Sequence, residues 1–282
     1  MMRNRRRTGV RRYLNVMNVA VFLTVLFVLV PLYFMVVSSF KNPNTIGQSL
    51  QLWPAQWTVK NYTYVWTASH FGRNILNSLI VSVCSTILVL ALGSMAGYAL
   101  GRLPMRGKLP ILMTLLMISV FPVIGVIAPL YVVLRTIGWL NSYQALILPY
   151  TAFNLPFAIW ILRNYFLGIP REMEETGRID GASPMRTLVQ IIMPQAAPGL
   201  FTAAVFCFTA CWTEYLMALS FDSNTNMHTI PVAIGSALST IYTVPYGPYF
   251  AASCMAAVPI GILVLVFRKS VVSGLTSGAV KG

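Results

Sequence analysis

The sequence predicts an all-α polytopic membrane protein with six transmembrane helices and a charged loop between the fourth and the fifth. Hydrophobic residues make up 57% of the 282 residues, charged residues make up 9%, and the mean hydropathy is +0.71. These values lie outside the range of a soluble domain. Apolar runs long enough to cross a bilayer as helices recur six times. The runs are continuous, whereas a membrane β-barrel would show short alternating segments.

Short polar segments separate the expected spans. The spans are Val16–Phe40, Asn74–Leu100, Leu109–Leu134, Ser142–Phe166, Leu200–Phe221 and Tyr246–Phe267. We divide the chain into a basic tail (1–15), a six-helix domain (16–268) that includes the loop 167–199, and a second tail (269–282). The first run is too long for a secretory signal and no A-x-A-like cleavage site follows it, so we expect an uncleaved first span.

The distribution of Lys and Arg predicts the orientation. With an even number of spans, both termini lie on one side of the membrane. That side holds sixteen of the twenty Lys and Arg residues, and the other holds Lys41, Lys60, Arg73 and Arg135. Positively charged loops stay in the cytoplasm, so we expect both termini and the loop 167–199 to be cytoplasmic. The net charge of +14 is then explained by topology and by anionic membrane lipid, and we expect no nucleic acid partner.

The elements before the loop carry three local signals. Five Trp and Tyr residues between Lys41 and Arg73 favour anchoring at the membrane interface, and the alternative is a surface for an external partner. Gly93, Gly97 and Gly101 line one face of the second span, which favours close packing against another helix of the subunit. Pro122 and Pro129 in the third span, and Pro149 and Pro156 in the fourth, predict kinks.

Residues 169–198, IPREMEETGRIDGASPMRTLVQIIMPQAAP, predict two short helices that meet at a corner. Pro170 suits the first position of a helix, and three Glu residues follow it near the positive helix start. Gly181 can end that helix in the left-handed conformation. Ser183 and Pro184 suit the N-cap and first position of the next helix, which runs to Pro194.

This loop resembles that of the permease subunits of ATP-binding-cassette importers, and within them the carbohydrate-uptake branch. Glu175-Thr176-Gly177 stands where the family has E-A-A, and Arg178 to Ser183 follow the carbohydrate-branch form closely. Ile191-Ile192-Met193-Pro194 closes the motif. The resemblance extends to Trp212-Thr213-Glu214-Tyr215 and to the ending Gly274 to Gly282, and so covers nearly the whole chain. Thr176, Gly177 and Met193 depart from the family pattern, and Gly177 costs a helix about 1 kcal/mol relative to Ala.

The resemblance implies a non-catalytic subunit of an ATP-driven carbohydrate importer in a bacterial inner membrane. Its expected partners are a related second permease, two cytoplasmic ATPase copies and an external sugar-binding protein; a homodimer is the alternative to the permease pair. The residues implied in coupling to the ATPase are Glu172, Glu175, Arg178, Asp180, Gly181, Ala182 and Pro194. The tail residues Gly278 and Lys281 would also reach the ATPase. We expect no cofactor on this chain, because it lacks a G-x-x-x-x-G-K-[ST] loop, and ATP and Mg would be used by the partner.

Glu214 is the one acid well inside an expected span, which makes it a candidate for lining the pathway; the alternatives are a bond to a neighbouring helix or a position close to the membrane interface. Trp212, Tyr215 and Asn154 offer stacking or hydrogen bonds to a sugar, or serve as packing residues.

Two other classes of protein are alternatives to the importer. An ion-coupled secondary transporter would show charged or broken-helix sites at mid-membrane and often repeats, of which Glu214 is thin support. A membrane enzyme would need a catalytic cluster, and His70 and His228 lie far in sequence from any acidic cluster. The four cysteines fall in expected spans and indicate neither a disulfide nor a metal site.

Overall fold

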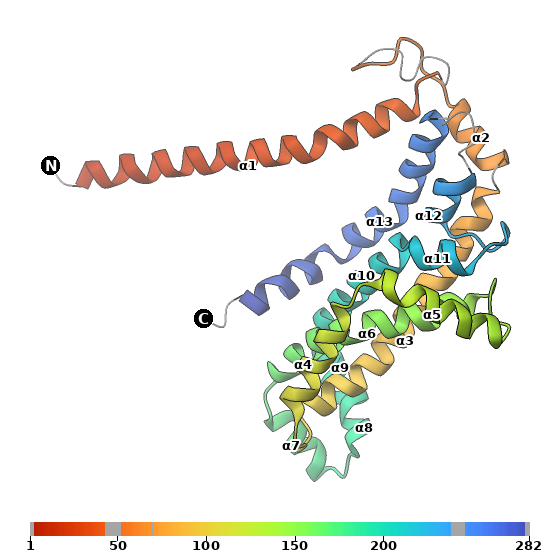
Figure 1. The fold of residues 1–282 in the computed structure, drawn as a ribbon. Helices are drawn as coiled ribbons and strands as arrows, with labels where there is room; N and C mark the ends of the chain where they lie inside the picture. Colours follow the sequence, from red (N-terminus) through yellow and green to blue (C-terminus); the bar gives the residue numbers. More distant parts are fainter. Residues whose placement is uncertain (1–2, 43–51, 69, 238–245, 280–282) are drawn as a thin grey trace. The chain divides into compact units, whose positions relative to one another are not determined.

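The computed structural model describes residues 3–42, 52–68, 70–237 and 246–279, and all regular elements within these ranges are helical (Figure 1). The chain divides into two compact units. The first comprises Met1–Ser69 and Leu238–Met255, and the second comprises His70–Ala237 and Ala256–Gly282. Among the residues that the structure describes, four helices are long and apolar enough to cross a membrane, and two bent helix pairs raise that number to six if each pair is one span. The predicted all-α membrane fold is confirmed.

The first unit joins α1 (Arg3–Ser39) and α2 (Lys60–Ala68) through a buried amide. Asn61 donates from Nδ2 to the backbone oxygens of Ser39 and Lys41, at 2.8 Å each. Tyr62 adds a hydroxyl contact of 2.7 Å to Ser39, and its ring lies 5.1 Å from that of Phe40. These contacts hold α2 against the end of the first apolar helix.

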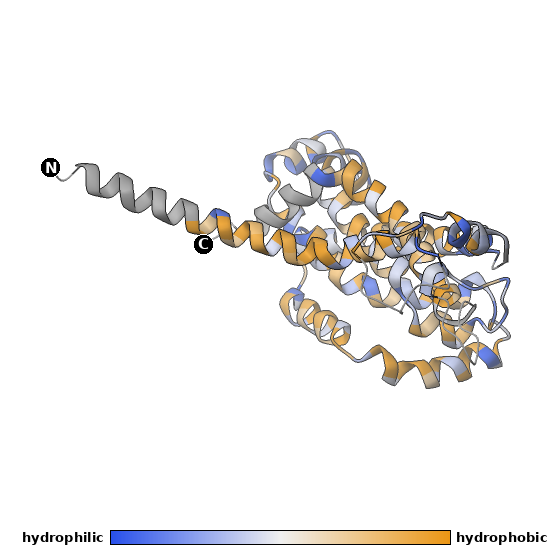
Figure 2. Cartoon of the chain, turned by 90° about the horizontal axis from the view of Figure 1, so that it is seen from above, coloured by the Kyte–Doolittle hydropathy of each residue, from blue (hydrophilic) through white to orange (hydrophobic). Residues whose placement is uncertain are grey.

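Apolar residues predominate along the long helices, and hydrophilic residues gather in the connecting segments (Figure 2). The apolar part of α1, Val16–Ser39, has none of its most hydrophobic window buried in the protein, and Phe27 is 81% exposed. A soluble protein rarely exposes contiguous apolar surface of this extent, so these faces are suited to lipid. The chain is accordingly a multi-pass membrane protein.

In the second unit, α3 (Phe71–Gly101) packs closely on α6 (Tyr143–Leu167). A Cβ on Gly97 would lie 3.1 Å from the backbone nitrogen of Arg163, and Gly93 and Gly101 face the same helix. The predicted packing role of these glycines within the subunit is confirmed, because lack of a side chain lets the two backbones approach. Pro149 and Pro156 lie inside α6, which continues through both.

The expected third span, Leu109–Leu134, is wrong as a continuous helix. It consists of α4 (Lys108–Ser119) and α5 (Val123–Thr136), which meet at 87° (Figure 1). Pro122 has ψ 117°, an extended conformation, and it N-caps α5. A proline has no N–H to continue the first helix and disfavours helical backbone at the residue before it, and at Pro122 the two helices are separated. Pro129, by contrast, lies inside α5 without ending it.

The expected fifth span, Leu200–Phe221, is also interrupted. The helix α10 (Ala197–Thr213) ends one residue before Glu214, whose ψ of 130° is extended, and α11 (Leu216–Phe221) follows. The helix α12 (Ile230–Val232) and the π-helical turn η2 (Ala233–Ala237) come next. The Ser78 hydroxyl accepts from the Ile230 amide at 2.8 Å and fixes this segment to α3.

The helix α13 (Tyr246–Ala279) contains the last expected span and continues through most of the tail. Its apolar part is Tyr246–Arg268. Gly278 therefore lies within a helix, and Lys281 lies outside the described residues. Their predicted contact with an ATPase stays a prediction.

Candidate functional site

The charged loop folds as the sequence predicts at its corner and differs at its start. The helix α7 comprises Glu172–Ile179 and begins after Pro170, which we expected at its first position. The reason is that hydrogen bonding continues for two residues beyond α6: the Gly168 and Ile169 amides donate to the backbone oxygens of Tyr165 and Phe166, respectively. Pro170 is consequently used in the reversal that follows and not in the helix.

The corner is a Schellman motif at Gly181. The Ala182 amide donates to the Gly177 oxygen at 2.9 Å, and the Gly181 amide donates to the Arg178 oxygen at 3.0 Å. Gly181 has φ +75°, and a Cβ there would meet nothing within 4 Å. This is the left-handed C-cap that glycine favours, and the predicted helix end is confirmed.

The second loop helix begins as predicted with α8 (Pro184–Thr187). The Ser183 hydroxyl accepts from the Arg186 amide at 3.4 Å, and Pro184 lies in the first turn. A π-helical turn, η1 (Leu188–Ile192), and α9 (Met193–Gln195) follow. Pro194 has no N–H with which to continue the α-helical hydrogen bonds of the preceding turn, which accounts for the wider turn there. The segment ends after Gln195, just beyond the expected stop at Pro194.

The coupling candidates lie mostly on the outer surface of this loop. Those with exposed side chains are Glu172, Glu175, Arg178, Asp180 and Pro194; Gly181 is exposed and Ala182 is half-buried. Figure 1 shows α7 and α8 beyond the ends of α3 and α6. The structure brings the candidates other than Pro194 together around the Gly181 corner, and Pro194 lies at the far end of the second loop helix.

Gly177, which departs from the E-A-A pattern, lies on the inner face of α7. A Cβ there would be 2.5 Å from Cδ1 of Ile191, so the two loop helices meet closely at this point. Ile191 Cδ1 is the end of a flexible side chain and can move, which limits the cost of Ala at this position. No pattern in the sequence indicates a tertiary neighbour for α7, so this contact is not predictable from the sequence.

Sequence reasoning missed three residues of the loop region. Ile179, at the end of α7, is an apolar side chain with 86% of its surface exposed. Glu174 and Arg102 are buried and form an ion pair of 3.1 Å between α7 and the end of α3. The spacing of Glu174 and Gly177 on one helix face could have suggested an inner face for α7, but no sequence signal pointed to Arg102.

Glu214 lies at the break between α10 and α11 and not well inside a span, which corrects the expected position. Its Oε1 accepts from the Met217 amide at 2.9 Å, and its Oε2 accepts from the Ala218 amide at 3.2 Å. Oε2 also accepts from the Tyr150 hydroxyl at 2.6 Å. The carboxylate therefore caps α11 and joins it to α6.

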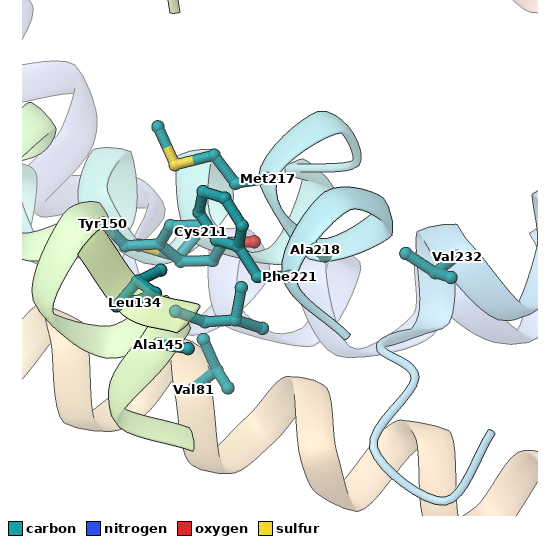
Figure 3. Close-up of a cluster of buried hydrophobic side chains, with 10 residues drawn as sticks. Val81, Leu134, Ala145, Tyr150, Cys211, Met217, Ala218, Phe221 and Val232 are labelled. Carbon is teal, nitrogen blue, oxygen red and sulfur yellow. The ribbon is translucent and has the colours of Figure 1, made fainter. Parts of the chain in front are cut away.

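Tyr150 connects this cap to a buried hydrophobic cluster. Figure 3 shows its ring among Cys211, Met217 and Phe221, which come from α10 and α11. Tyr150 is 2% exposed, so its hydroxyl depends on Glu214 for a hydrogen-bond partner. Asn154, one turn further along α6, donates from Nδ2 to the backbone oxygen of Tyr150 at 2.8 Å.

The two remaining pathway candidates are packed beside the same break. Trp212 is 2% exposed, donates from Nε1 to the Ala256 oxygen at 3.1 Å and stacks on Phe208 with ring centroids 5.4 Å apart. Tyr215 is half-buried, and its ring would lie 2.9 Å from a Cβ on Gly235. Asn154, Trp212, Glu214 and Tyr215 thus surround one interruption of the helical bundle.

Comparison with known proteins gives agreeing results at three levels. Residues 90–276 match the family model described as "Binding-protein-dependent transport system inner membrane component". The trehalose/maltose transport system permease protein MalG of Thermococcus litoralis is 37% identical over 90% of this chain and 92% of its own length. The trehalose transport system permease protein SugB of Mycobacterium tuberculosis is 36% identical over 92% of this chain and 95% of its own. A chain of a bacterial ABC transporter involved in the import of the acidic polysaccharide alginate superposes with a TM-score of 0.78, at 20% identity, over 95% of this chain and 98% of that one.

Proposed function

Because the chain belongs to the family of inner membrane components of binding-protein-dependent transport systems, we propose that it is the permease subunit of an ATP-driven carbohydrate importer. It forms part of the translocation pathway and transmits movement from partner ATPase subunits. Sugar as the substrate class rests on the two permease relatives, both of which are named for disaccharide transport. The particular sugar is not assigned.

The observation that carries the coupling role is the division of α7 into two faces. Glu174 and Gly177 face the protein, while Glu172, Glu175 and Ile179 face outward. An isoleucine that is 86% exposed on a charged loop helix, outside the apolar spans, is suited to dock in a pocket of a partner protein. Exposed ion pairs contribute only about 0–1 kcal/mol, so the shape of this helix and corner should matter more than any single charge.

An ATPase partner is proposed because this chain has no motif for binding ATP. The sequence has no phosphate-binding loop, so two cytoplasmic ATPase copies would bind ATP and Mg²⁺ and supply the motor. Docking of the loop requires it and both termini to be cytoplasmic, in agreement with the positive charge on that side. The tail with Gly278 and Lys281 would give the ATPase a second contact.

Two further partners complete the proposed importer. The family description implies an external binding protein that delivers the sugar. A second, related permease would complete the pathway, and a homodimer is the alternative. When ATP closes the ATPase dimer, the docked loops would move together and the helical bundles would open outward. Hydrolysis would then reset them.

The pathway would pass the break between α10 and α11. Asn154 and Tyr215 are half-buried there and carry groups that can bond to a sugar. Trp212 and Glu214 would hold these two residues in position without contacting the sugar. Trp212 is almost fully buried, and both carboxylate oxygens of Glu214 accept hydrogen bonds from the protein. An ion-coupled carrier would need a free charged group at this break, and Glu214 does not provide one because its carboxylate oxygens accept three hydrogen bonds from the protein.

The test substitutes Gly181, where an added side chain would meet no neighbouring atom and only the backbone conformation limits which residue fits. G181V forces a β-branched residue to φ +75°, whereas G181N places a residue that tolerates this conformation. Tagged wild type and both variants are purified with their partners, and uptake of labelled trehalose and maltose is measured in proteoliposomes with and without ATP.

We expect the wild type to retain an ATPase and to show ATP-dependent uptake of at least one labelled sugar. G181V should hydrolyse ATP with less uptake per ATP, and G181N should resemble the wild type. Sugar uptake that follows an ion gradient and ignores ATP would overturn the proposal and favour the secondary transporter. Equal coupling in G181V and the wild type would remove the corner from the mechanism.

A further inference from the structure

One buried side chain joins the loop to two membrane helices. Arg102 follows α3 directly, and its Nε lies 3.1 Å from Oε1 of Glu174 in the first turn of α7. The two side chains are 3% and 6% exposed. The same guanidinium donates to the backbone oxygens of Phe166 and Ile169 at the end of α6. Arg102 therefore contacts three elements that are distant in sequence.

The electrostatics of the three helix ends favour this arrangement. The carboxyl ends of α3 and α6 carry partial negative charge, and the start of α7 carries partial positive charge. The guanidinium lies at the two negative ends, and the Glu174 carboxylate lies at the positive one. A guanidinium presents five N–H donors in a planar fork, so it can donate to both backbone oxygens while its charge faces Oε1 of Glu174, which pairs with it by charge and accepts no hydrogen bond.

Apolar packing excludes water from the pair. A buried cluster of Tyr98, Phe166, Leu188 and Ile192 joins α3, α6 and η1 on the same side of the loop. Tyr98 and Phe166 pack edge to face with centroids 6.4 Å apart. In such surroundings removal of one partner leaves the other charged and unpaired, which is far more disruptive than loss of an exposed pair. Arg178, which is 4.0 Å from Glu174, is 59% exposed and cannot replace Arg102.

We propose that Arg102 is a positioning residue that fixes α7 to the ends of α3 and α6, so that the three move as one rigid body. A push on the outer face of α7 is then delivered to the second and fourth apolar spans. This inference rests on the proposed coupling role of the loop. It differs from a purely stabilising role because it requires the distance between α7 and α3 to stay fixed while the ATPase changes state.

The test measures that distance by electron spin resonance in the assembled transporter. Spin labels are placed at Thr176 on the outer face of α7 and at Met95, which is 47% exposed on α3, with the native cysteines replaced. Distances are recorded without nucleotide and with ATP and vanadate. The variants are R102M and E174Q, and the matched control is R106M, which changes an exposed arginine of the next loop. Labelled trehalose uptake per ATP is measured on the same samples.

We expect a single narrow distance in the wild type and in R106M, the same in both nucleotide states. In R102M and E174Q the distance should broaden when ATP and vanadate are added, and sugar uptake per ATP should be lower. If R102M does not assemble, E174Q, which keeps the side-chain shape, carries the test. A wild-type distance that changes with nucleotide, or variants that keep the narrow distance, would overturn the inference. A wild type that retains no ATPase would instead overturn the proposed function.

Discussion

Replacing Glu214 with alanine tests whether this carboxylate supports the break between α10 and α11 or acts on the transported molecule. Its two oxygens accept from the Met217 and Ala218 amides and from the Tyr150 hydroxyl. Loss of the helix cap costs about 0.5–2 kcal/mol. The Tyr150 hydroxyl, on a residue that is 2% exposed, would lose its partner at a cost of about 1–3 kcal/mol. We therefore expect E214A to lose about 2–5 kcal/mol of stability.

The assay is the fraction of monodisperse protein that survives heating in detergent, followed by size-exclusion chromatography. For a chain of this size each kcal/mol corresponds to about 2–4 °C in the melting temperature. Y150F removes only the hydroxyl and should cost about 1 kcal/mol. The double variant Y150F/E214A should melt higher than E214A, because it no longer buries an unpartnered hydroxyl.

The reasoning would be refuted if E214A had the melting temperature of the wild type, or if the double variant Y150F/E214A melted at a lower temperature than E214A. A variant that melts normally but loses sugar uptake would place Glu214 in the pathway. E214Q adds a second comparison, because it keeps one carbonyl acceptor and removes the charge. If charge on the pathway is what matters, E214Q should lose uptake without losing stability.

Three further perturbations test separate parts of the structure. G97A should destabilise the protein, because its Cβ would lie 3.1 Å from a backbone nitrogen of α6. In G93A the added Cβ would meet side chains only at 3.4 Å or more, so this variant should be neutral or stabilised by up to about 1 kcal/mol. Equal melting temperatures for G97A and G93A would contradict this reasoning. I179S should weaken retention of the ATPase during purification without changing the melting temperature, and full retention would remove Ile179 from the docking surface. Burial raises the pKa of Asp222 from 3.8 to about 7, so ionisation favours the unfolded state and stability falls as the pH rises between these values. D222N should therefore gain about 3 kcal/mol of stability relative to the wild type on going from about pH 5 to pH 8, and its melting temperature should rise relative to the wild type over the same range; a pH-independent difference would exclude the buried charge as the cause.

The parts of the loop that the sequence predicts are those decided within a few residues. Gly181 ends a helix because it alone adopts φ +75° without strain, and Ser183 with Pro184 begins the next because both satisfy a helix start by themselves. The prediction that Pro170 begins a helix is wrong, because backbone hydrogen bonds continue the preceding turn through Ile169 and the position of Pro170 depends on where α6 ends. Local chemistry predicts a cap, and tertiary context decides which of two adjacent caps is used.

The two interrupted spans show where hydropathy stops being informative. Hydropathy reports whether a residue can lie in lipid, and it is similar for a straight helix and for two helices at 87°. Pro122 separates its helices while Pro129, Pro149 and Pro156 do not, although all four are prolines in apolar runs. A proline inside a helix can be accommodated by its neighbours, so the outcome depends on contacts that a single sequence does not contain.

The construction of the loop limits how force can travel through it. Its inner face is tied to the membrane helices by the Arg102–Glu174 pair and by the cluster around Phe166, and its two helices meet at Gly177 with no room for a side chain unless Ile191 moves. If the loop transmits movement from an ATPase as proposed, its packed contacts would rearrange in discrete steps and not stretch, so the bending would occur elsewhere in the unit. The breaks at Pro122 and Glu214, where helices end and restart, are the places where the bundle can change direction, and the second of them is held by a cap and a single tyrosine hydroxyl.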